Sequence, residues 1–438
     1  MRRLEHAPQH EELRALSSQA GGGSKGTRRA AQRAFLIHAG TEASQGLDEL
    51  RELMKTAGAA TVGTATQTRS EPHPDSYMGS GKALEILDQI KATDANLVVA
   101  DDELSPRQER NLEEILKMPV VDRTAVILDI FALHAGSAEG KLQVELAQLE
   151  YNLARMRGLW THLERLGGGI GTRGPGESQL ETDRRLARDR ISTVRKRLNK
   201  VQSNRKLMRS ERERTEVPQI ALVGYTNAGK STLMNSVTGS EVGIRDELFH
   251  TLDPTTRQFE HRGRNYVMTD TVGFIRKLPH QLVDAFGATL EETIHAEVLV
   301  LVEDGSQPPQ ERQERREAVE ETLSQIGASE LPRLTVVNKS DLMSAAEIEE
   351  MQIQRPEVLM VSAETGEGVG QLLDAASASI GSRMVEVHLL IPYSEGRLLD
   401  EIYRVAGDLT RESGETGVEL TAKMRPDQAA RYSRFAID

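Results

Sequence analysis

The chain contains no cysteine, and this absence removes several kinds of chemistry at once. Disulfide bonds, thiolate zinc sites and thiol catalysis are excluded, and the composition fits a cytoplasmic protein. Aromatic residues are scarce, with 7 phenylalanines, 7 tyrosines and 1 tryptophan, too few for a broad surface that stacks nucleic-acid bases. No apolar run approaches the roughly 18 residues of a membrane helix. Polar residues follow Met1–Arg3, where a secretory signal would be apolar.

The length and charge of the chain describe a protein of several domains. Its 438 residues suffice for roughly two to four separate cores. The formal net charge is −12, which argues against a general nucleic-acid coat. Residues 1–32 are glycine-containing and polar, and we expect a disordered tail there. Short apolar runs alternate with helical patterns over 33–137, which predicts a small α/β domain with a largely parallel sheet.

The middle of the chain changes to a helical pattern. Four leucines in the segment 138–215 recur at helical spacing and form an amphipathic stripe: Leu142, Leu146, Leu149 and Leu153. A glycine-rich segment at 167–176 separates them from a second helical pattern, so a helical hairpin is predicted. Strand–helix alternation resumes over 216–382 and predicts a second α/β domain. Residues 383–438 read as a small α+β domain.

A phosphate-binding motif opens the second α/β domain. The stretch Gly224–Ser231 matches the P-loop pattern G-x-x-x-x-G-K-[ST], and a strand pattern precedes it while a helical pattern follows. Backbone N–H groups would surround the phosphates, Lys230 would reach the β- and γ-phosphates, and Ser231 would ligate Mg²⁺. The predicted nucleotide-binding residues of this loop are Gly224, Tyr225, Thr226, Asn227, Ala228, Gly229, Lys230, Ser231 and Thr232.

Three further motifs follow at predicted strand ends, in the order typical of GTP-binding domains. Asp270 would hold the ligands of Mg²⁺ without binding the ion directly, and the backbone N–H of Gly273 would donate a hydrogen bond to the γ-phosphate. Asp341 can accept hydrogen bonds from guanine N1–H and its exocyclic amine, whereas adenine would leave that carboxylate unpaired. A backbone amide after the next strand can reach the guanine oxygen. The predicted guanine-binding residues are Asn338, Lys339, Asp341, Ser362, Ala363 and Glu364.

No side chain is an obvious general base for hydrolysis. Phe274 stands where Ras-like enzymes carry the glutamine that orients the attacking water, so slow intrinsic turnover that needs outside help is expected. Lys230, Asn227 and Gly273 are then the candidate transition-state stabilisers. Asn227 occupies the position at which potassium-activated GTPases, which this loop resembles, bind the cation; an asparagine that tolerates a tight turn is the alternative. Thr251 is the preferred switch threonine and Mg²⁺ ligand.

The second predicted helix of the hairpin is strongly basic. Residues 184–209 carry eleven lysines and arginines and one acidic residue, Asp189. Ion pairs with Glu145, Glu150 and Glu164 of the partner helix would neutralise only a few of these charges, so contact with RNA phosphates is predicted. The candidate RNA contacts are Arg173 in the glycine-rich segment and Arg184, Arg185, Arg188, Arg195 and Lys196 on the helix.

Several stretches of the chain resemble the HflX family of ribosome-associated GTPases. The resemblance covers about 33 to 438, and the stretches that carry it are Gly167–Glu177 with Gln179–Arg185, Gly140–Leu149, Tyr77–Lys82 and Thr251–Arg257. It implies an N-terminal α/β domain, a long helical hairpin, a Ras-like P-loop G domain and a small α+β C-terminal domain. It also implies a cytoplasmic, Mg²⁺-dependent GTPase that binds the large (50S) ribosomal subunit and its rRNA and promotes dissociation of stalled or idle ribosomes.

The sequence departs from the family pattern in three places. Phe131–Ala138 has lost a more basic run, His250 replaces a small residue before Thr251, and Val302–Gly305 is altered. Some family members use ATP through the N-terminal region, but no motif here indicates a second nucleotide site.

Two other functions stay open from the sequence. One is a GTP-switched RNA-binding scaffold in ribosome assembly or RNA remodelling. The other is a GTPase that works with RNA-modifying enzymes or a membrane, which the lack of a lipid anchor disfavours. The expected ligands are GTP and GDP, with K⁺ as a candidate second cofactor, and we expect a monomer without DNA binding or stable membrane association.

Overall fold

The computed structural model describes residues 32–41, 45–156, 175–215, 217–239, 248–249, 253–277, 292–382 and 384–437. Its contacts divide the chain into two compact units. The first contains Met1–Lys200, Arg245–Asp253 and Arg276–Gly287, and the second contains Val201–Ile244, Pro254–Ile275 and Ala288–Asp438. Nearly all of the predicted tail and most of the glycine-rich segment lie outside the described residues. The predicted domain boundaries stay predictions.

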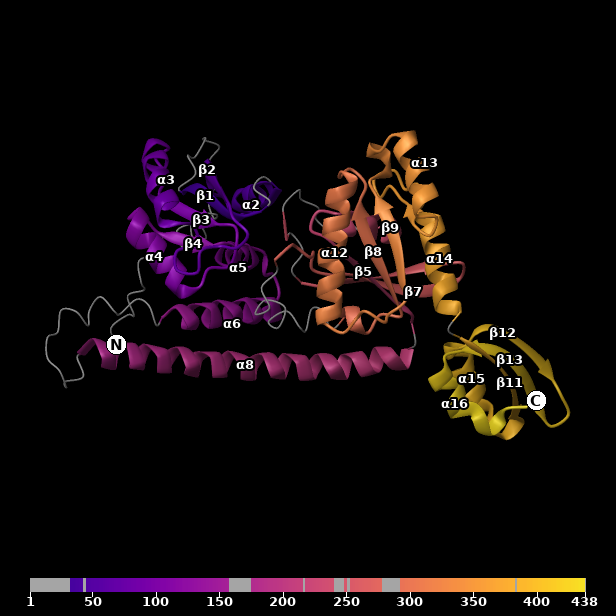
Figure 1. The fold of residues 1–438 in the computed structure, drawn as a ribbon. Helices are drawn as coiled ribbons and strands as arrows, with labels where there is room; N and C mark the ends of the chain where they lie inside the picture. Colours follow the sequence, from indigo (N-terminus) through magenta and orange to yellow (C-terminus); the bar gives the residue numbers. More distant parts are fainter. Residues whose placement is uncertain are drawn as a thin grey trace, which may run out of the picture. The chain divides into compact units, whose positions relative to one another are not determined.

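The first unit contains the predicted parallel sheet, with helices on its two faces (Figure 1). The strands are all parallel in the order β2-β1-β3-β4, and they are β1 (Arg33–Gly40), β2 (Ala60–Thr68), β3 (Leu97–Ala100) and β4 (Val120–Asp122). The helices are α2 (Gln45–Thr56), α3 (Ser80–Ala92), α4 (Pro106–Leu116) and α5 (Arg123–His134). The predicted α/β class is confirmed for this segment.

Side chains that alternate along β1 divide between the two faces of this sheet, because successive strand residues point to opposite sides. Phe35 and Ile37 are buried in one hydrophobic cluster with Ile86 of α3 and Leu112 of α4. Helices α2 and α5 pack against each other, and α2 also packs on β1 and β2. The start of α5 is fixed by Asp122, whose side chain accepts a hydrogen bond from Ala125 N.

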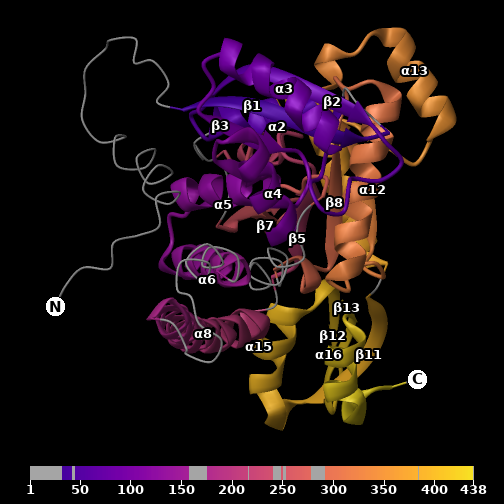
Figure 2. The same ribbon diagram turned by 60° about the vertical axis from the view of Figure 1, so that its left-hand side comes forward.

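The predicted hairpin helices are α6 (Ala138–Arg155) and α8 (Pro175–Thr215), which lie side by side in Figures 1 and 2. The predicted leucine stripe of α6 packs against α8, in a cluster made of Leu146, Ile191, Val194 and Leu198 with the partly buried Leu142, Leu149 and Leu153. Helix α8 is long but highly charged, and no helix in the described part of the chain has the length and apolar character to cross a membrane.

The second unit contains a six-stranded sheet in the order β10-β9-β8-β5-β7-β6. Its strands are β5 (Gln219–Gly224), β6 (Thr255–His261), β7 (Arg264–Asp270), β8 (Val298–Asp304), β9 (Arg333–Asn338) and β10 (Leu359–Met360). Only β6 runs antiparallel to its neighbour, β7, because the two form a hairpin. The helices are α9 (Lys230–Thr238), α12 (Pro309–Gln325), α13 (Ala345–Gln354) and α14 (Val369–Gly381), with the short η1 (Ser340–Leu342).

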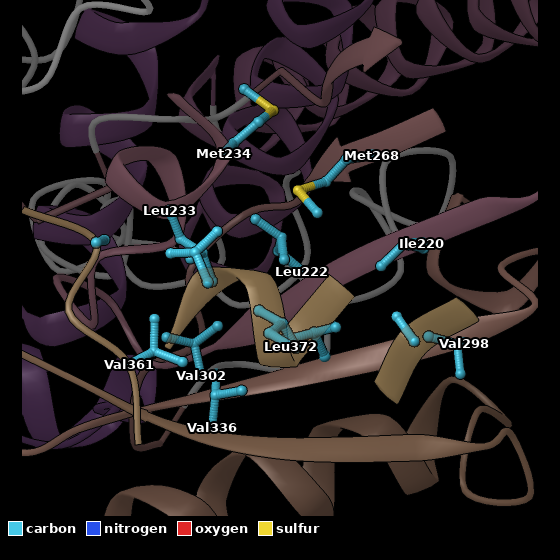
Figure 3. Close-up of a cluster of buried hydrophobic side chains, with 14 of the residues drawn as sticks. Ile220, Leu222, Leu233, Met234, Met268, Val298, Val302, Val336, Val361 and Leu372 are labelled. Atoms are coloured by element: carbon cyan, nitrogen blue, oxygen red, sulfur yellow. The ribbon is translucent and has the colours of Figure 1, made fainter. Parts of the chain in front are cut away.

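One face of this sheet carries the main core of the second unit. Figure 3 shows Leu222 of β5, Val302 of β8 and Val336 of β9 gathered near Leu372 of α14, and all four belong to one buried cluster with Leu233 of α9. Burial of a large aliphatic side chain contributes roughly 1.5–3 kcal/mol. The core therefore fixes the strands whose carboxyl ends carry the predicted nucleotide motifs.

The last residues form a separate α+β layer in the second unit. Strands β11 (Val385–Pro392) and β12 (Gly407–Ser413) both pair antiparallel with β13 (Gly417–Met424). Helices α15 (Gly396–Val405) and α16 (Pro426–Tyr432) and the short η2 (Tyr393–Glu395) and η3 (Ser433–Phe435) complete it. Leu389, Leu420 and Ile402 are buried in its core.

A buried ionic cluster joins the helices and strands of the first α/β sheet. Arg123 of α5 is 2% exposed, its Nη1 lies 3.0 Å from Asp101 Oδ1, and it also pairs with Glu49 of α2. His38 Nδ1 of β1 lies 3.1 Å from Asp101 Oδ2. Burial raises the pKa of Asp101, but the hydrogen bond with His38 and the charges of Arg123 and Lys277 outweigh it and hold the pKa below its usual value.

Replacing Arg123 by methionine should strongly destabilise this sheet. The substitution removes the guanidinium that Asp101 and Glu49 share, and breaking a buried ion pair by removing one partner costs about 3–5 kcal/mol. Arg107→Met is the matched control, because Arg107 pairs with Asp75 at 2.9 Å on the surface, with side chains 67% and 45% exposed, and such a pair contributes less than about 1 kcal/mol. Hydrogen exchange of peptides from β1 and β3 measures the opening free energy. Equal losses in the two variants would contradict this account.

Candidate functional site

The predicted P-loop forms the turn between β5 and α9. Gly224 has φ 155° and Gly229 has φ 90°, conformations that L side chains rarely adopt. A Cβ at Gly224 would lie 2.4 Å from the carbonyl oxygen of Val302, and one at Gly229 would lie 2.2 Å from Asn338 Nδ2. Both glycines are therefore required by close packing as well as by backbone conformation. Asn227 is also left-handed, with φ 61°.

The side chain of Lys230 lies inside this loop. It is 6% exposed, and its Nζ donates hydrogen bonds to the carbonyl oxygens of Gly224 at 3.1 Å and Tyr225 at 2.8 Å. Burial lowers the pKa of Lys230 to about 8, and the charge of Asp270 partly opposes this shift. The loop thus holds a desolvated amine at the start of α9, in the place where a phosphate would provide the missing negative charge.

Two oxygen-bearing side chains meet next to this lysine. Ser231 Oγ donates a hydrogen bond to Asp270 Oδ2 at 2.6 Å, and Asp270 at the end of β7 is fully buried. Hydroxyl and carboxylate oxygens are the ligands that Mg²⁺ prefers, so the residues present fit this ion. Gly273, three residues after Asp270, also lies close to the lysine. A Cβ at Gly273 would lie 2.8 Å from Thr226 Cγ2 and 3.1 Å from Lys230 Nζ. Its backbone therefore approaches the lysine as no larger residue could.

Phe274 is held by the P-loop itself. Its backbone N–H donates to the carbonyl oxygen of Gly224 at 3.1 Å, and its own carbonyl accepts from Thr226 N at 2.8 Å. The residue is 1% exposed. Its ring, which has no polar group for a water molecule, is therefore buried, and the expected slow turnover stays a prediction.

The predicted guanine-binding residues lie at the ends of β9 and β10. Asn338 Nδ2 donates to the carbonyl oxygen of Ala228 at 3.0 Å, and Asn338 Oδ1 accepts from Ala363 N at 3.0 Å. One side chain therefore connects the P-loop to the loop after β10. Ser362 Oγ donates to Asp341 Oδ1 at 2.6 Å, which fixes the carboxylate predicted to bind guanine.

The structure brings the predicted nucleotide residues together at one edge of the sheet. The carboxyl ends of parallel strands meet there, so motifs separated by more than a hundred residues become neighbours. Thr232 is half-buried on α9 and Glu364 is exposed after β10. Thr251 lies outside the described residues.

Residues on both sides of Thr251 make contacts that the sequence did not predict. The rings of Phe249 and Phe131 meet edge to face, with centroids 4.6 Å apart. Asp253 Oδ2 accepts hydrogen bonds from the backbone N–H groups of Gly136 at 3.1 Å and Ser137 at 2.7 Å, at the start of α6. Carboxylates are favoured at helix N-termini, but nothing local in the sequence identifies a partner more than a hundred residues away.

Lys277, which follows the predicted Gly273 motif, also belongs to the first unit. Its Nζ lies 3.2 Å from Asp101 Oδ2 and pairs with Asp102 as well. Tyr77 Oη donates to the other oxygen of Asp102 at 2.6 Å. Asp253 and Lys277, which lie on either side of Pro254–Ile275 in the sequence, are therefore held by the residues that precede α6 and by those that follow β3.

The predicted RNA-binding residues of α8 line a groove against α6. Arg184, Arg188, Arg195 and Lys196 border it, together with Glu150 of α6. Arg195 Nη2 donates to Glu150 Oε1 at 2.6 Å, and Arg190 Nε donates to Glu145 Oε1 at 2.7 Å, so two of the basic residues are neutralised within the hairpin. Arg185 is exposed on the same helix, and Arg173 lies outside the described residues.

Four family models match consecutive parts of the chain. They are described as GTP-binding GTPase N-terminal (residues 44–132), GTP-binding GTPase middle region (134–212), 50S ribosome-binding GTPase (219–339) and HflX C-terminal domain (347–435). The last match begins within α13, before the small α+β layer.

Proteins called GTPase HflX are similar to nearly the whole chain. The protein from Escherichia coli (strain K12) is 45% identical over 382 residues, which cover 86% of this chain and 89% of that protein. The protein from Lacrimispora saccharolytica is 46% identical over 382 residues and covers 87% and 90%. A crystal structure of a GTP-binding protein from Sulfolobus solfataricus in complex with GDP is 26% identical, covers 80% of this chain and 99% of that chain, and has a TM-score of 0.41.

Changing Asp341 to asparagine should change base preference. The amide cannot accept from both guanine N1–H and the exocyclic amine, whereas it can donate to the oxygen that xanthine carries instead of that amine. Loss of the matched hydrogen bonds costs about 1–3 kcal/mol and should weaken GTP binding by roughly fivefold to a hundredfold, while XTP binding improves. Equilibrium titration with both nucleotides measures the ratio. An unchanged preference for GTP would show that Asp341 does not recognise guanine.

Proposed function

This chain belongs to the HflX family of GTPases and hydrolyses GTP, and on that premise we propose that it binds the large ribosomal subunit and promotes dissociation of stalled or idle ribosomes. It would do so in its GTP form, in the cytoplasm. The observation that carries the ribosomal part of the proposal is the groove of Arg184, Arg188, Arg195 and Lys196 in a chain whose net charge is −12. A basic surface on an acidic protein favours a localised polyanion such as rRNA.

We assign the phosphate-binding role to the P-loop. The buried amine of Lys230 would exchange its carbonyl partners Gly224 and Tyr225 for phosphate oxygens, at the N-terminus of α9. Ser231 and Thr251 would bind Mg²⁺. Asp270 would not bind the ion itself but would orient Ser231 through their hydrogen bond. The ion would neutralise charge on the phosphates.

We assign hydrolysis to stabilisation of charge by fixed groups. Lys230, the amide of Gly273 and Asn227 would stabilise the charge that develops on the phosphates; the closeness of Gly273 to Lys230 Nζ and the left-handed backbone of Asn227 in the same loop support this assignment. Asn227 could also offer its side-chain oxygen to K⁺, a second positive charge at the same place. Because Phe274 supplies no group to orient water, the chain alone would turn over slowly, and the ribosome would provide the missing catalytic contact.

The hydrogen bonds of Asp253 suggest how the nucleotide would affect the hairpin. Asp253 lies two residues after Thr251 and binds the N-terminus of α6 through Gly136 and Ser137. Binding of Thr251 to Mg²⁺ and the γ-phosphate would therefore act through the chain on Asp253 and on its contact at the start of α6. In the same way, a change in the backbone at Gly273 would alter the ion pairs that Lys277 makes with Asp101 and Asp102.

Charge reversal in the α8 groove should reduce ribosome binding. Arg188→Glu with Lys196→Glu reverses two groove residues that have no carboxylate partner among the described side chains. Loss of two phosphate contacts should weaken binding of the GTP-analogue form to purified large subunits by roughly tenfold or more and flatten its salt dependence. Sedimentation at two salt concentrations measures both quantities.

The matched control is Arg197→Glu with Lys200→Glu, an equal change of charge at exposed positions of the same helix outside the groove. We expect this variant to bind within about threefold of the unchanged protein, because long-range charge effects are largely screened at physiological salt. Equal losses in both variants would indicate a general charge effect, and no loss in either would move the ribosomal contact away from α8.

A further inference from the structure

Asp304 is a buried carboxylate close to the nucleotide site, and no role has been assigned to it above. It ends β8, lies opposite Asn338 in the register of β8 with β9, and is 5% exposed. The phosphate and guanine contacts proposed above involve the ends of β5, β7, β9 and β10, whereas β8 lies between β5 and β9 in the sheet. The end of β8 therefore faces the middle of the same site.

The two oxygens of Asp304 have different partners. Oδ1 accepts from Ser306 N at 3.0 Å and from Ser306 Oγ at 2.6 Å, which fixes the carboxylate on its own turn. Oδ2 accepts from Lys339 Nζ at 2.8 Å. Burial raises the pKa of Asp304, but the hydrogen bonds from Lys339 and Ser306 outweigh it and lower the pKa. At neutral pH, the ammonium of Lys339 thus faces a fixed negative charge.

The backbone around Lys339 is as closely fixed as its side chain. Lys339 has φ 63° and ψ 35°, a left-handed conformation that is strained for a residue with a Cβ. Gly305 N donates to the carbonyl oxygen of Asn338 at 2.8 Å. A Cβ at Gly305 would lie 2.7 Å from Met343 Sδ and 2.8 Å from the same carbonyl, so the turn after β8 packs directly on the Asn338–Lys339 backbone.

We propose that Asp304 is a positioning residue for guanine nucleotides: it holds the side chain of Lys339 beside the base that Asp341 recognises, and so sets affinity for GTP and GDP alike. The inference rests on the guanine role proposed for Asp341. A lysine side chain has many rotamers. A lysine that is already ordered before the nucleotide binds loses less conformational entropy on binding. Because Asp304 contacts Lys339 on the base side of the site, whereas the phosphate role is assigned to Lys230 and Gly273, we expect the hydrolysis step to be unaffected.

Asp304→Asn tests this role with little change in shape. The amide oxygen can still accept from Ser306, but the charge that holds Lys339 is lost. Titration with fluorescent GDP and a non-hydrolysable GTP analogue should show both dissociation constants raised about tenfold, while the single-turnover hydrolysis rate at saturating GTP stays within twofold. A loss that affected only GTP, or only the hydrolysis rate, would overturn the inference.

Glu303→Gln is the matched control for stability. Glu303 is the preceding residue, is also 5% exposed, and binds Arg355 through both oxygens at 2.9 and 3.0 Å, away from Lys339. The variant should lose thermal stability to a similar extent as Asp304→Asn and keep its nucleotide affinity within twofold. If the two variants lose affinity equally, Asp304 acts through stability alone and the inference is wrong.

A double-mutant cycle with Lys339→Met tests the route of the effect. Methionine keeps an apolar stem and removes the ammonium, so Asp304→Asn should weaken binding no further in that background. Additive losses would show that Asp304 does not act through Lys339. If neither Lys339→Met nor Asp341→Asn changes nucleotide binding, the proposed guanine site itself fails; if both do and Asp304→Asn does not, only this inference fails.

Discussion

The nucleotide site depends on one buried side-chain amide. Asn338 is 2% exposed, and its amide donates to Ala228 in the P-loop and accepts from Ala363 after β10. The same amide lies so close to Gly229 that a Cβ there would be 2.2 Å from Asn338 Nδ2, which leaves no room for a larger residue. A buried amide left without these partners would lose about 1–3 kcal/mol for each unmade hydrogen bond. The phosphate side and the base side of the site are therefore one connected structure, and the strand core beneath them keeps it in place.

We expect the chemistry of this site to be electrostatic, because none of the residues assigned to it is a general base. A desolvated lysine, a serine–aspartate pair suited to Mg²⁺ and close backbone amides provide fixed positive charge and hydrogen-bond donors. The buried ring of Phe274 provides nothing for the attacking water. Under the proposed function, a site built in this way would bind GTP and hydrolyse it slowly until the ribosome contributes a further group.

Much of the fold could be predicted because buried parallel strands are continuous apolar runs. All four residues of β3 and all residues of β5 except Gln219 are buried, so both strands stand out in the sequence as short apolar runs, and the P-loop is fixed by glycines whose roles are local. Strand β6 was not predicted, since it is an antiparallel edge strand, Thr255–His261, in which only Phe259 is buried. The partners of Asp253, Lys277 and Asp304 could not be predicted either, because each lies across the fold and no local pattern encodes the pairing.

The central claim is that this GTPase obtains its missing catalytic help from the large ribosomal subunit. The most direct measurement is the GTP turnover of the full chain in potassium buffer, with and without purified large subunits. The account predicts slow turnover alone and strong stimulation by the subunits, with the stimulation reduced in the α8 groove variant but not in its matched control. Fast turnover by the chain alone, or equally slow turnover in both conditions, would contradict it.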